Sequence, residues 1–327
     1  MDTGQINPIR NTKYLRPQKE WGWPIAIYLY LAGMGAGSFA IGVIWDWLGY
    51  SAHPSNAVLL FGPLLAAIGA PFLILDLGIK RRFLNAGLNP RTSWLSRGFF
   101  ILLLFIAFGV VTLAMSILPL WGISVGPVLF RILEVIGLIL AFATAIYTGI
   151  LLKALKYIPF WNTPLLPILF LVSALSTGSM LIILSTLGSS LLVPYGEYSS
   201  QLTNVLMRTE QILVFIEAVI LGIFLFSRYR TKEQGRTSVN VLISGHLKFV
   251  FWGGIIVAGF FFPIVLEAVY SKLPEHTFLL FLTGIFLLVG GFFLRFGIIS
   301  AGIKEQLPLH KLIELQYNSM TLRKKQL

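Results

Sequence analysis

The 327-residue chain contains no cysteine. This absence excludes disulfides, cysteine-ligated iron–sulfur clusters and thiolate zinc sites within the chain. Histidine is also scarce, and the four histidines lie near the ends of apolar runs or in the C-terminal tail, at His53, His246, His276 and His310. A haem held between membrane helices needs facing histidines inside the membrane. The sequence therefore predicts neither a metal nor a haem in this chain, and a cytochrome b is not expected.

Charge is the second thing the chain has little of. Only 12% of its residues are charged and 56% are hydrophobic, whereas a soluble domain carries roughly 25% charged residues. Eight apolar runs are long enough to cross about 30 Å of hydrocarbon, and they cover residues 23–46, 56–79, 94–118, 127–153, 164–192, 204–227, 246–270 and 277–303. We predict an all-α integral membrane protein with eight transmembrane helices, which short connections join into neighbouring antiparallel pairs.

The cations are distributed unevenly along the chain. Its net charge is +12, and 21 of the 25 lysines and arginines lie in the two tails and in every second connection. By the positive-inside rule, this bias places both termini in the cytoplasm. The flanking segments are accordingly a cytoplasmic N-terminal tail, 1–22, and a basic C-terminal tail, 304–327. Because the cations gather at membrane edges, the charge indicates contact with lipid rather than with nucleic acid.

The segment 76–98 stands between two apolar runs and reads DLGIKRRFLNAGLNPRTSWLSRG. Asn89-Pro90 marks a break, because proline disfavours the α conformation in the residue before it. Asp76 lies about one helical turn inside the membrane, where an acid is costly without a partner. Arg82 lies near the surface and can reach back to it. Two interpretations stay open: an ion pair that fixes the loop, or part of a binding site.

Further ionisable residues lie inside other apolar runs. Arg131 and Glu134 are three residues apart on one helix and predict a structural ion pair. Glu217 lies close to the middle of its run, and Arg295 lies about two turns from the end of the last one. A carboxylate at mid-membrane must be protonated or paired. Glu217 is therefore either a satisfied interhelical contact or part of a proton relay.

Four motifs, taken in order, resemble those of a known family. Segment 76–98 is similar to the D-L-x-x-x-x-R-F…N-P-x-S signature of the NrfD/polysulphide-reductase (PsrC-type) membrane-subunit family. The run YTGILLKALKYIPFWNTPLLPILFLVSALSTG, from Tyr147, resembles its second signature, Y-T-G…P-x-W-N…L-P…S-x-x-x-G. The runs WGWPIAIYLYLAGMGAG and GGFFLRFGIISAG also match. The resemblance covers roughly residues 20–303.

The resemblance implies a fold and a function. The fold would be two four-helix bundles, 23–155 with the quinone site and 156–303, in the inner membrane of a prokaryotic cell. The function would be that of a subunit of a quinone-linked respiratory oxidoreductase, which exchanges electrons between menaquinone or ubiquinone and a docked iron–sulfur subunit. That partner would in turn serve a molybdopterin subunit or a multihaem cytochrome.

The resemblance also implies site residues. Tyr147 matches the family's quinone-bonding tyrosine, Tyr28 occupies a position where the family can place a histidine, and Asp76 matches an acidic position. Less specific motif matches are Arg82, Trp161 and Asn162. Quinone reduction consumes two protons, so hydroxyl donors and an ionisable group suit such a pocket. Two alternatives stay open: an ion- or proton-coupled transporter, and a structural anchor that does not use quinone.

Overall fold

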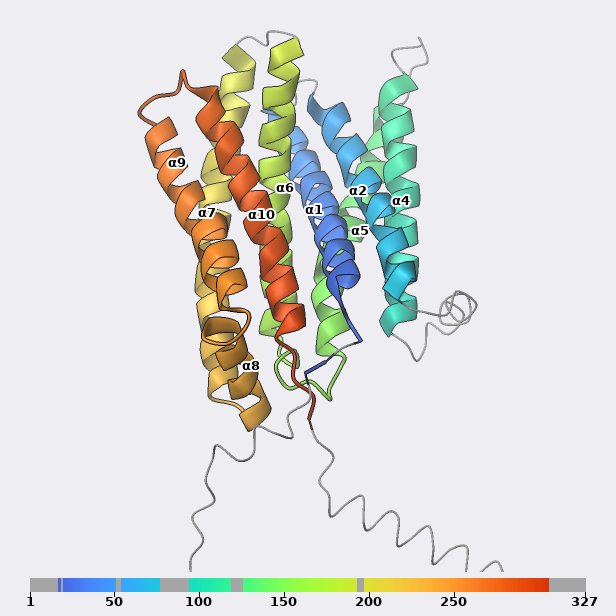
Figure 1. The fold of residues 1–327 in the computed structure, drawn as a ribbon. Coiled ribbons are helices and arrows are strands. Elements are labelled where there is room, and N and C mark those ends of the chain that lie inside the picture. Colours follow the sequence, from blue (N-terminus) through green and yellow to red (C-terminus); the bar gives the residue numbers. More distant parts are fainter. Residues whose placement is uncertain are drawn as a thin grey trace, which may run out of the picture.

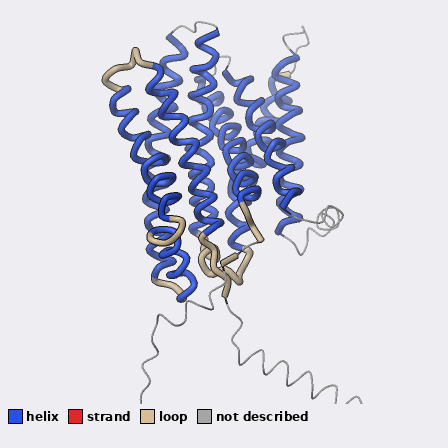
Figure 2. The backbone as a smooth tube through the Cα atoms, in the orientation of Figure 1, coloured by secondary structure: helices blue, strands red, loops and turns tan. Residues whose placement is uncertain are grey.

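The computed structural model describes residues 17–18, 20–50, 54–76, 94–118, 126–192 and 197–305. Within these residues the chain is almost entirely helical. The helices lie side by side with their axes roughly aligned (Figure 1). Short loops join them at the two ends of the array (Figure 2). The one strand-like contact in the described part is an isolated antiparallel bridge between Pro17 and Ile303.

The helices follow the apolar runs closely. Their bounds are α1 Trp23–Trp45, η2 Asp46–Tyr50, α2 Pro54–Asp76, α4 Trp94–Ile117, α5 Pro127–Lys153, α6 Leu165–Leu192, α7 Glu197–Tyr229, α8 Glu233–Ile243, η4 Val250–Phe261, α9 Phe262–Tyr270 and α10 Thr277–Ser300. Prolines near the starts of α1 and α5 are tolerated, because the first turn of a helix has free N–H groups in any case. Among the described residues, seven helices are long and apolar enough to cross a membrane.

Three regions differ in detail from the predicted runs. The run 246–270 forms two elements, the π-helix η4 and the α-helix α9. Pro263, at the start of α9, cannot donate a backbone hydrogen bond, and the helix changes its bonding pattern immediately before it. The cationic connection after α7 contains the short helix α8, which the sequence interpretation did not include. The predicted second span corresponds to α2, whose apolar described part, Phe61–Leu73, is shorter than the seven candidates.

Helices α1 and α6 form the centre of the array. α1 packs against α2, α5, α6 and α10, and α6 packs against α1, α5, α7 and α10. The two central helices cross where both lack side chains: a Cβ atom on Gly37 would overlap the carbonyl group of Ala174, and one on Gly178 would overlap the backbone at Gly37. Such small residues let membrane helices approach closely. Helices α1 and α6 are therefore in direct backbone contact at their crossing.

The two ends of the array differ, and we name them. The terminal end holds the start of α1, the ends of α5 and α10, and helix α8; the opposite end holds η2 and the loop 271–276 (Figures 1 and 2). At the terminal end the Gln18 side chain donates to the carbonyls of Trp21, at 2.7 Å, and Ile299, at 3.1 Å. Ion pairs join Lys304 to Glu20 and Lys232 to Glu305. These contacts tie both ends of the described chain together.

Candidate functional site

Two tyrosines meet inside the array near the terminal end. Tyr28 comes five residues after the start of α1 and Tyr147 six residues before the end of α5, so both lie roughly 7–9 Å from those helix ends. Their side chains are buried, with 0% and 2% of the residue exposed. The two phenol groups are close enough to interact. Neither hydroxyl, however, has a hydrogen-bond partner of suitable geometry among the described residues.

Helix α4 supplies a wall of this site. Gly98 lies four residues into α4, and a Cβ atom there would overlap the phenol ring and hydroxyl of Tyr147. Because antiparallel helices alternate in direction, α2 ends and α4 begins at this same end of the array. Asp76 is the last residue of α2. Its side chain and Arg82 lie outside the described residues, so their predicted pairing remains a prediction.

The two hydroxyls without hydrogen-bond partners determine which kind of ligand suits the site. A buried hydroxyl without a partner costs about 1–3 kcal/mol relative to a satisfied one. Two phenol O–H groups, side by side in an apolar interior, are donors suited to the carbonyl oxygens of a ligand. Tyr28 and Tyr147 therefore fit a compound that presents carbonyl acceptors. The described residues contain no cluster of side chains that could hold a metal ion.

Trp161 and Asn162 lie in the connection 154–164, between α5 and α6. The Trp161 side chain is fully buried, its indole N–H donates to the carbonyl of Ile298 at 2.9 Å, and its ring lies 5.9 Å from the ring of Trp21. Asn162 is exposed, and its backbone carbonyl accepts a hydrogen bond from Arg228 at 3.2 Å. Because the Trp161 donor is already used, a ligand could contact this residue only through its ring.

Sequence interpretation did not assign a role to two residues that shape the terminal end. Arg228 donates to the carbonyls of both Pro159 and Asn162, each at 3.2 Å, and so holds the connection 154–164 against α7. The charge pattern marks it only as one of the edge cations. Gly98 ends the first signature segment, and its close contact with Tyr147 could not be read from the sequence, because the two residues lie on different helices.

A second polar cluster surrounds Arg295 on α10. The residue is fully buried, and its guanidinium group donates to Ser173 Oγ at 3.0 Å and to the Gly291 carbonyl at 2.9 Å. It lies over the rings of Tyr30 and Phe170, at 5.4 and 5.5 Å, and interacts electrostatically with Glu217 of α7. Arg295 is thus close enough for its charge to act on the Glu217 carboxylate, although its Nε and Nη2 have no hydrogen-bond partner among the described residues.

The predicted ion pair on α5 is confirmed. Arg131 Nη1 lies 3.3 Å from Glu134 Oε2, and the same oxygen accepts a hydrogen bond from the indole of Trp47 at 2.9 Å. Asp46 lies 3.9 Å from Arg131. These contacts join the end of α1 to the start of α5 at the opposite end of the array.

A chain whose described residues include seven apolar helices of membrane-spanning length, with buried polar groups between them, is a multi-pass integral membrane protein. Comparison with known proteins gives its family. Residues 13–305 match the family described as "Polysulphide reductase, NrfD", and the chain belongs to this family. Among the predicted site residues that the structure describes, Tyr28 and Tyr147 are close enough to interact.

The sequence similarity to named relatives extends over most of the chain. The chain is 30% identical over 313 residues to the C subunit of the polysulfide reductase of Wolinella succinogenes, covering 86% of this chain and 94% of the relative. It is 28% identical over 314 residues to "Protein NrfD homolog" of Haemophilus influenzae, covering 88% and 95%. It is 29% identical over 306 residues to "Protein NrfD" of Escherichia coli, covering 86% and 94%.

Proposed function

We propose that this chain is the quinone-interacting membrane subunit of a respiratory oxidoreductase complex. The observation that carries the proposal is the pair of buried, unpartnered hydroxyls of Tyr28 and Tyr147. A bound quinone supplies an acceptor carbonyl for these donors and serves as a carrier of two electrons and two protons. The two phenols would orient the ring, and the close contact of Gly98 with Tyr147 would fix the direction of one donor.

Asp76 is proposed as the carboxylate that exchanges protons with this site. It is the last residue of α2, at the end of the array where Tyr28 and Tyr147 meet. Asp76→Asn keeps the size of the side chain but removes its exchangeable charge. We expect this variant to retain bound quinone while its turnover falls and the pH profile of turnover changes. If turnover per assembled complex is normal and only assembly fails, Asp76 is a structural partner instead.

The electrons must be exchanged with another subunit, because the chain lacks the cysteine ligands of an iron–sulfur cluster. We propose that an iron–sulfur subunit docks at the terminal end and connects the site to a molybdopterin subunit or a multihaem cytochrome. Cations are frequent on that face, including Lys156, Arg230 and Arg236. The Wolinella succinogenes relative is, by its name, one component of a polysulfide reductase, which supports an assembly of several subunits.

Both termini are proposed to be cytoplasmic. The start of α1 and the end of α10 lie at the same end of the array, which an even number of crossings requires. This supports counting α2 as an eighth span. A reporter that is active only outside the cytoplasm should therefore be silent when fused after Leu327 and active when inserted near Tyr195. The reverse pattern would place the terminal end, and the docked partner, outside the cytoplasm.

Quinone content of the purified complex tests the proposed function directly. Extraction should recover quinone in proportion to the membrane subunit. The double variant Tyr28→Phe/Tyr147→Phe should lose most of it, since losing two hydrogen bonds of about 1 kcal/mol each weakens binding by at most roughly 30-fold. Tyr270→Phe makes the same chemical change on α9 at the opposite end and serves as the matched control. A wild-type complex without quinone would favour a structural anchor or a transporter.

A further inference from the structure

Three buried carboxyl groups follow one another from the opposite end of the array toward its middle. Glu267 is one turn from the end of α9, and 4% of it is exposed. Glu210 of α7 is 1% exposed, and Glu217, seven residues further along the same helix, is 6% exposed. A spacing of seven residues is close to two turns, so Glu210 and Glu217 share a helix face about 10 Å apart along the axis. None of these acids is needed for the proposed quinone site.

The first two acids form a carboxyl pair. Glu210 and Glu267 are within hydrogen-bonding reach of one another. Both oxygens of Glu210, and Oε1 of Glu267, nevertheless lack any donor among the described groups. Two ionised carboxylates do not remain side by side in a buried site, because each disfavours the charge of the other. A proton held between them supplies the missing donor, so the pair is a place where a proton can reside.

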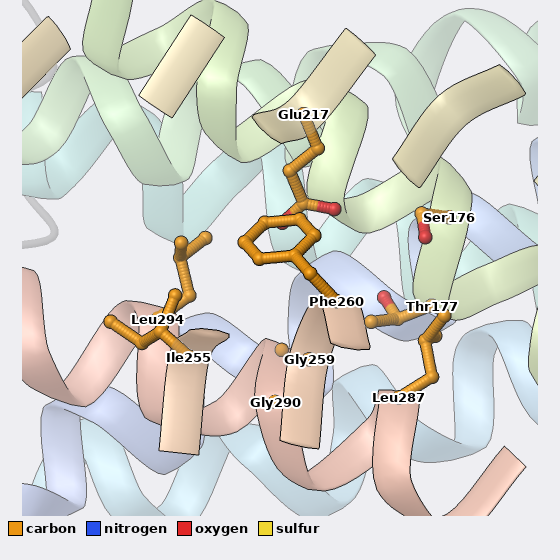
Figure 3. Close-up of a pocket in the computed structure, with 10 residues that line it drawn as sticks. Ser176, Thr177, Glu217, Ile255, Gly259, Phe260, Leu287, Gly290 and Leu294 are labelled. Atoms are coloured by element: carbon orange, nitrogen blue, oxygen red, sulfur yellow. The ribbon is translucent and has the colours of Figure 1, made fainter. Parts of the chain in front are cut away.

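A small cavity adjoins the third acid. Figure 3 shows the Glu217 side chain reaching from α7 toward Phe260, with Ser176 and Thr177 nearby on α6. The space has a volume of about 10 Å³, which suits roughly one water molecule. The Ser176 hydroxyl, which lines it, is 1% exposed and has no partner among the described groups. A water there would have Glu217 and Ser176 as polar neighbours.

Arg295 lies next to Glu217, at the end of the three acids that is nearest the middle of the array. It interacts with Glu217 and is bonded to Ser173, and on its far side it contacts Tyr30 of α1. The ionisable groups that face Glu217 are Arg295 from α10 and Glu210 from α7 itself. Helix α6 presents hydroxyls and η4 presents apolar residues. A fixed positive charge repels a hydrated proton, so Arg295 prevents protons from moving beyond Glu217 toward α1.

We propose that Glu267, Glu210 and Glu217 form a proton-exchange path from the opposite end of the membrane domain to Arg295. In each transfer the O–H bond of the Glu210–Glu267 pair breaks, a proton passes through water, and an O–H bond forms on the carboxylate of Glu217. The pair then regains a proton from the adjoining aqueous phase. No electron moves, and no co-reactant other than water is consumed. Glu217 alternates between a charged form paired with Arg295 and a neutral form.

Infrared spectroscopy of the complete protein in lipid vesicles separates this path from a static ion pair. The carbonyl stretch of a protonated carboxyl group should appear as pH falls and should shift after transfer into D₂O. Glu217→Gln should remove that titrating band. Glu134→Gln alters another buried acid, which is fixed by Arg131 and Trp47, and should leave it in place. If no titrating band depends on residue 217, Glu217 is permanently ionised and the proposal is overturned.

Two milder variants keep the proposal testable should Glu217→Gln fail to fold. Glu210→Gln retains a hydrogen bond to Glu267 but cannot pass a proton, and Ser176→Ala removes only the unpartnered hydroxyl at the cavity. Both should preserve the band of residue 217 and slow its hydrogen–deuterium exchange, by about tenfold or more for Glu210→Gln and about fivefold for Ser176→Ala. Unchanged exchange in Glu210→Gln would show that protons do not reach Glu217 by this route.

Discussion

Tyr147→Phe is expected to lower quinol-linked turnover by about 5- to 150-fold, which corresponds to roughly 1–3 kcal/mol of lost transition-state stabilisation. The substitution removes a hydroxyl that has no partner among the described groups. Folding should therefore be unaffected, and the whole effect should fall on a bound substrate. The measurement is turnover with a water-soluble quinol, divided by the amount of assembled complex.

Tyr28→Phe tests whether the two phenols act together. If both bond the same ligand, the double variant should lose less than the product of the two single losses, because interacting residues are not additive. Tyr270→Phe should turn over normally. Unchanged turnover in Tyr147→Phe would remove this residue from the site, even if the complex contains quinone.

Gly37→Ala is expected to produce the largest loss of stability. The added methyl group would overlap the backbone carbonyl of Ala174, and no side-chain rotation relieves a contact with backbone. Overpacking of a close-packed interior costs about 1–3 kcal/mol and at times more, and here α1 and α6 must separate. We expect a clear fall in the unfolding temperature in detergent and a lower yield of folded protein.

Gly222→Ala is the matched control for that experiment. A Cβ atom on Gly222 of α7 meets nothing within 4 Å among the described atoms, and alanine is the better helix former by about 1 kcal/mol in water. Its unfolding temperature should stay the same or rise. Equal unfolding temperatures for the two variants would mean that the crossing of α1 and α6 is looser than its geometry indicates.

The apolar runs predicted the positions of most helices, because the length and hydropathy of a segment depend only on the residues within it. The run 127–153 has the same bounds as α5, and the run 23–46 differs from α1 by one residue. Helix α8 was missed because its residues lie in a cationic connection, where charge and not apolar periodicity dominates the pattern. The change from π to α bonding before Pro263 was missed because a hydropathy run records only the apolar character of its residues, and not which carbonyl each backbone N–H bonds.

The candidate site was predictable only in part. Tyr28 and Tyr147 were found through their motifs, since nothing in the spacing of two residues so far apart indicates contact. Glu217 and Arg295 were each recognised as unusual in a membrane helix, but their proximity results from the packing of α7 and α10 against α6 around Ser173. The Glu210–Glu267 pair was not predicted, because each acid alone reads as a polar group near a helix end.

The contacts of the terminal end make the chain a closed loop. Gln18 donates to the carbonyl of Ile299, which lies 281 residues further along the chain. The buried face of α1 is covered only after α6 and α10 have been synthesised, because both helices pack against it. During synthesis, α1 therefore enters the membrane long before its last partner exists. The cost of closing a loop grows only slowly with its length, so the late contacts remain favourable. A ribosome that stops before α10 would release a chain without Arg295, the residue of α10 that faces Gly33 of α1, so this part of α1 would remain uncovered.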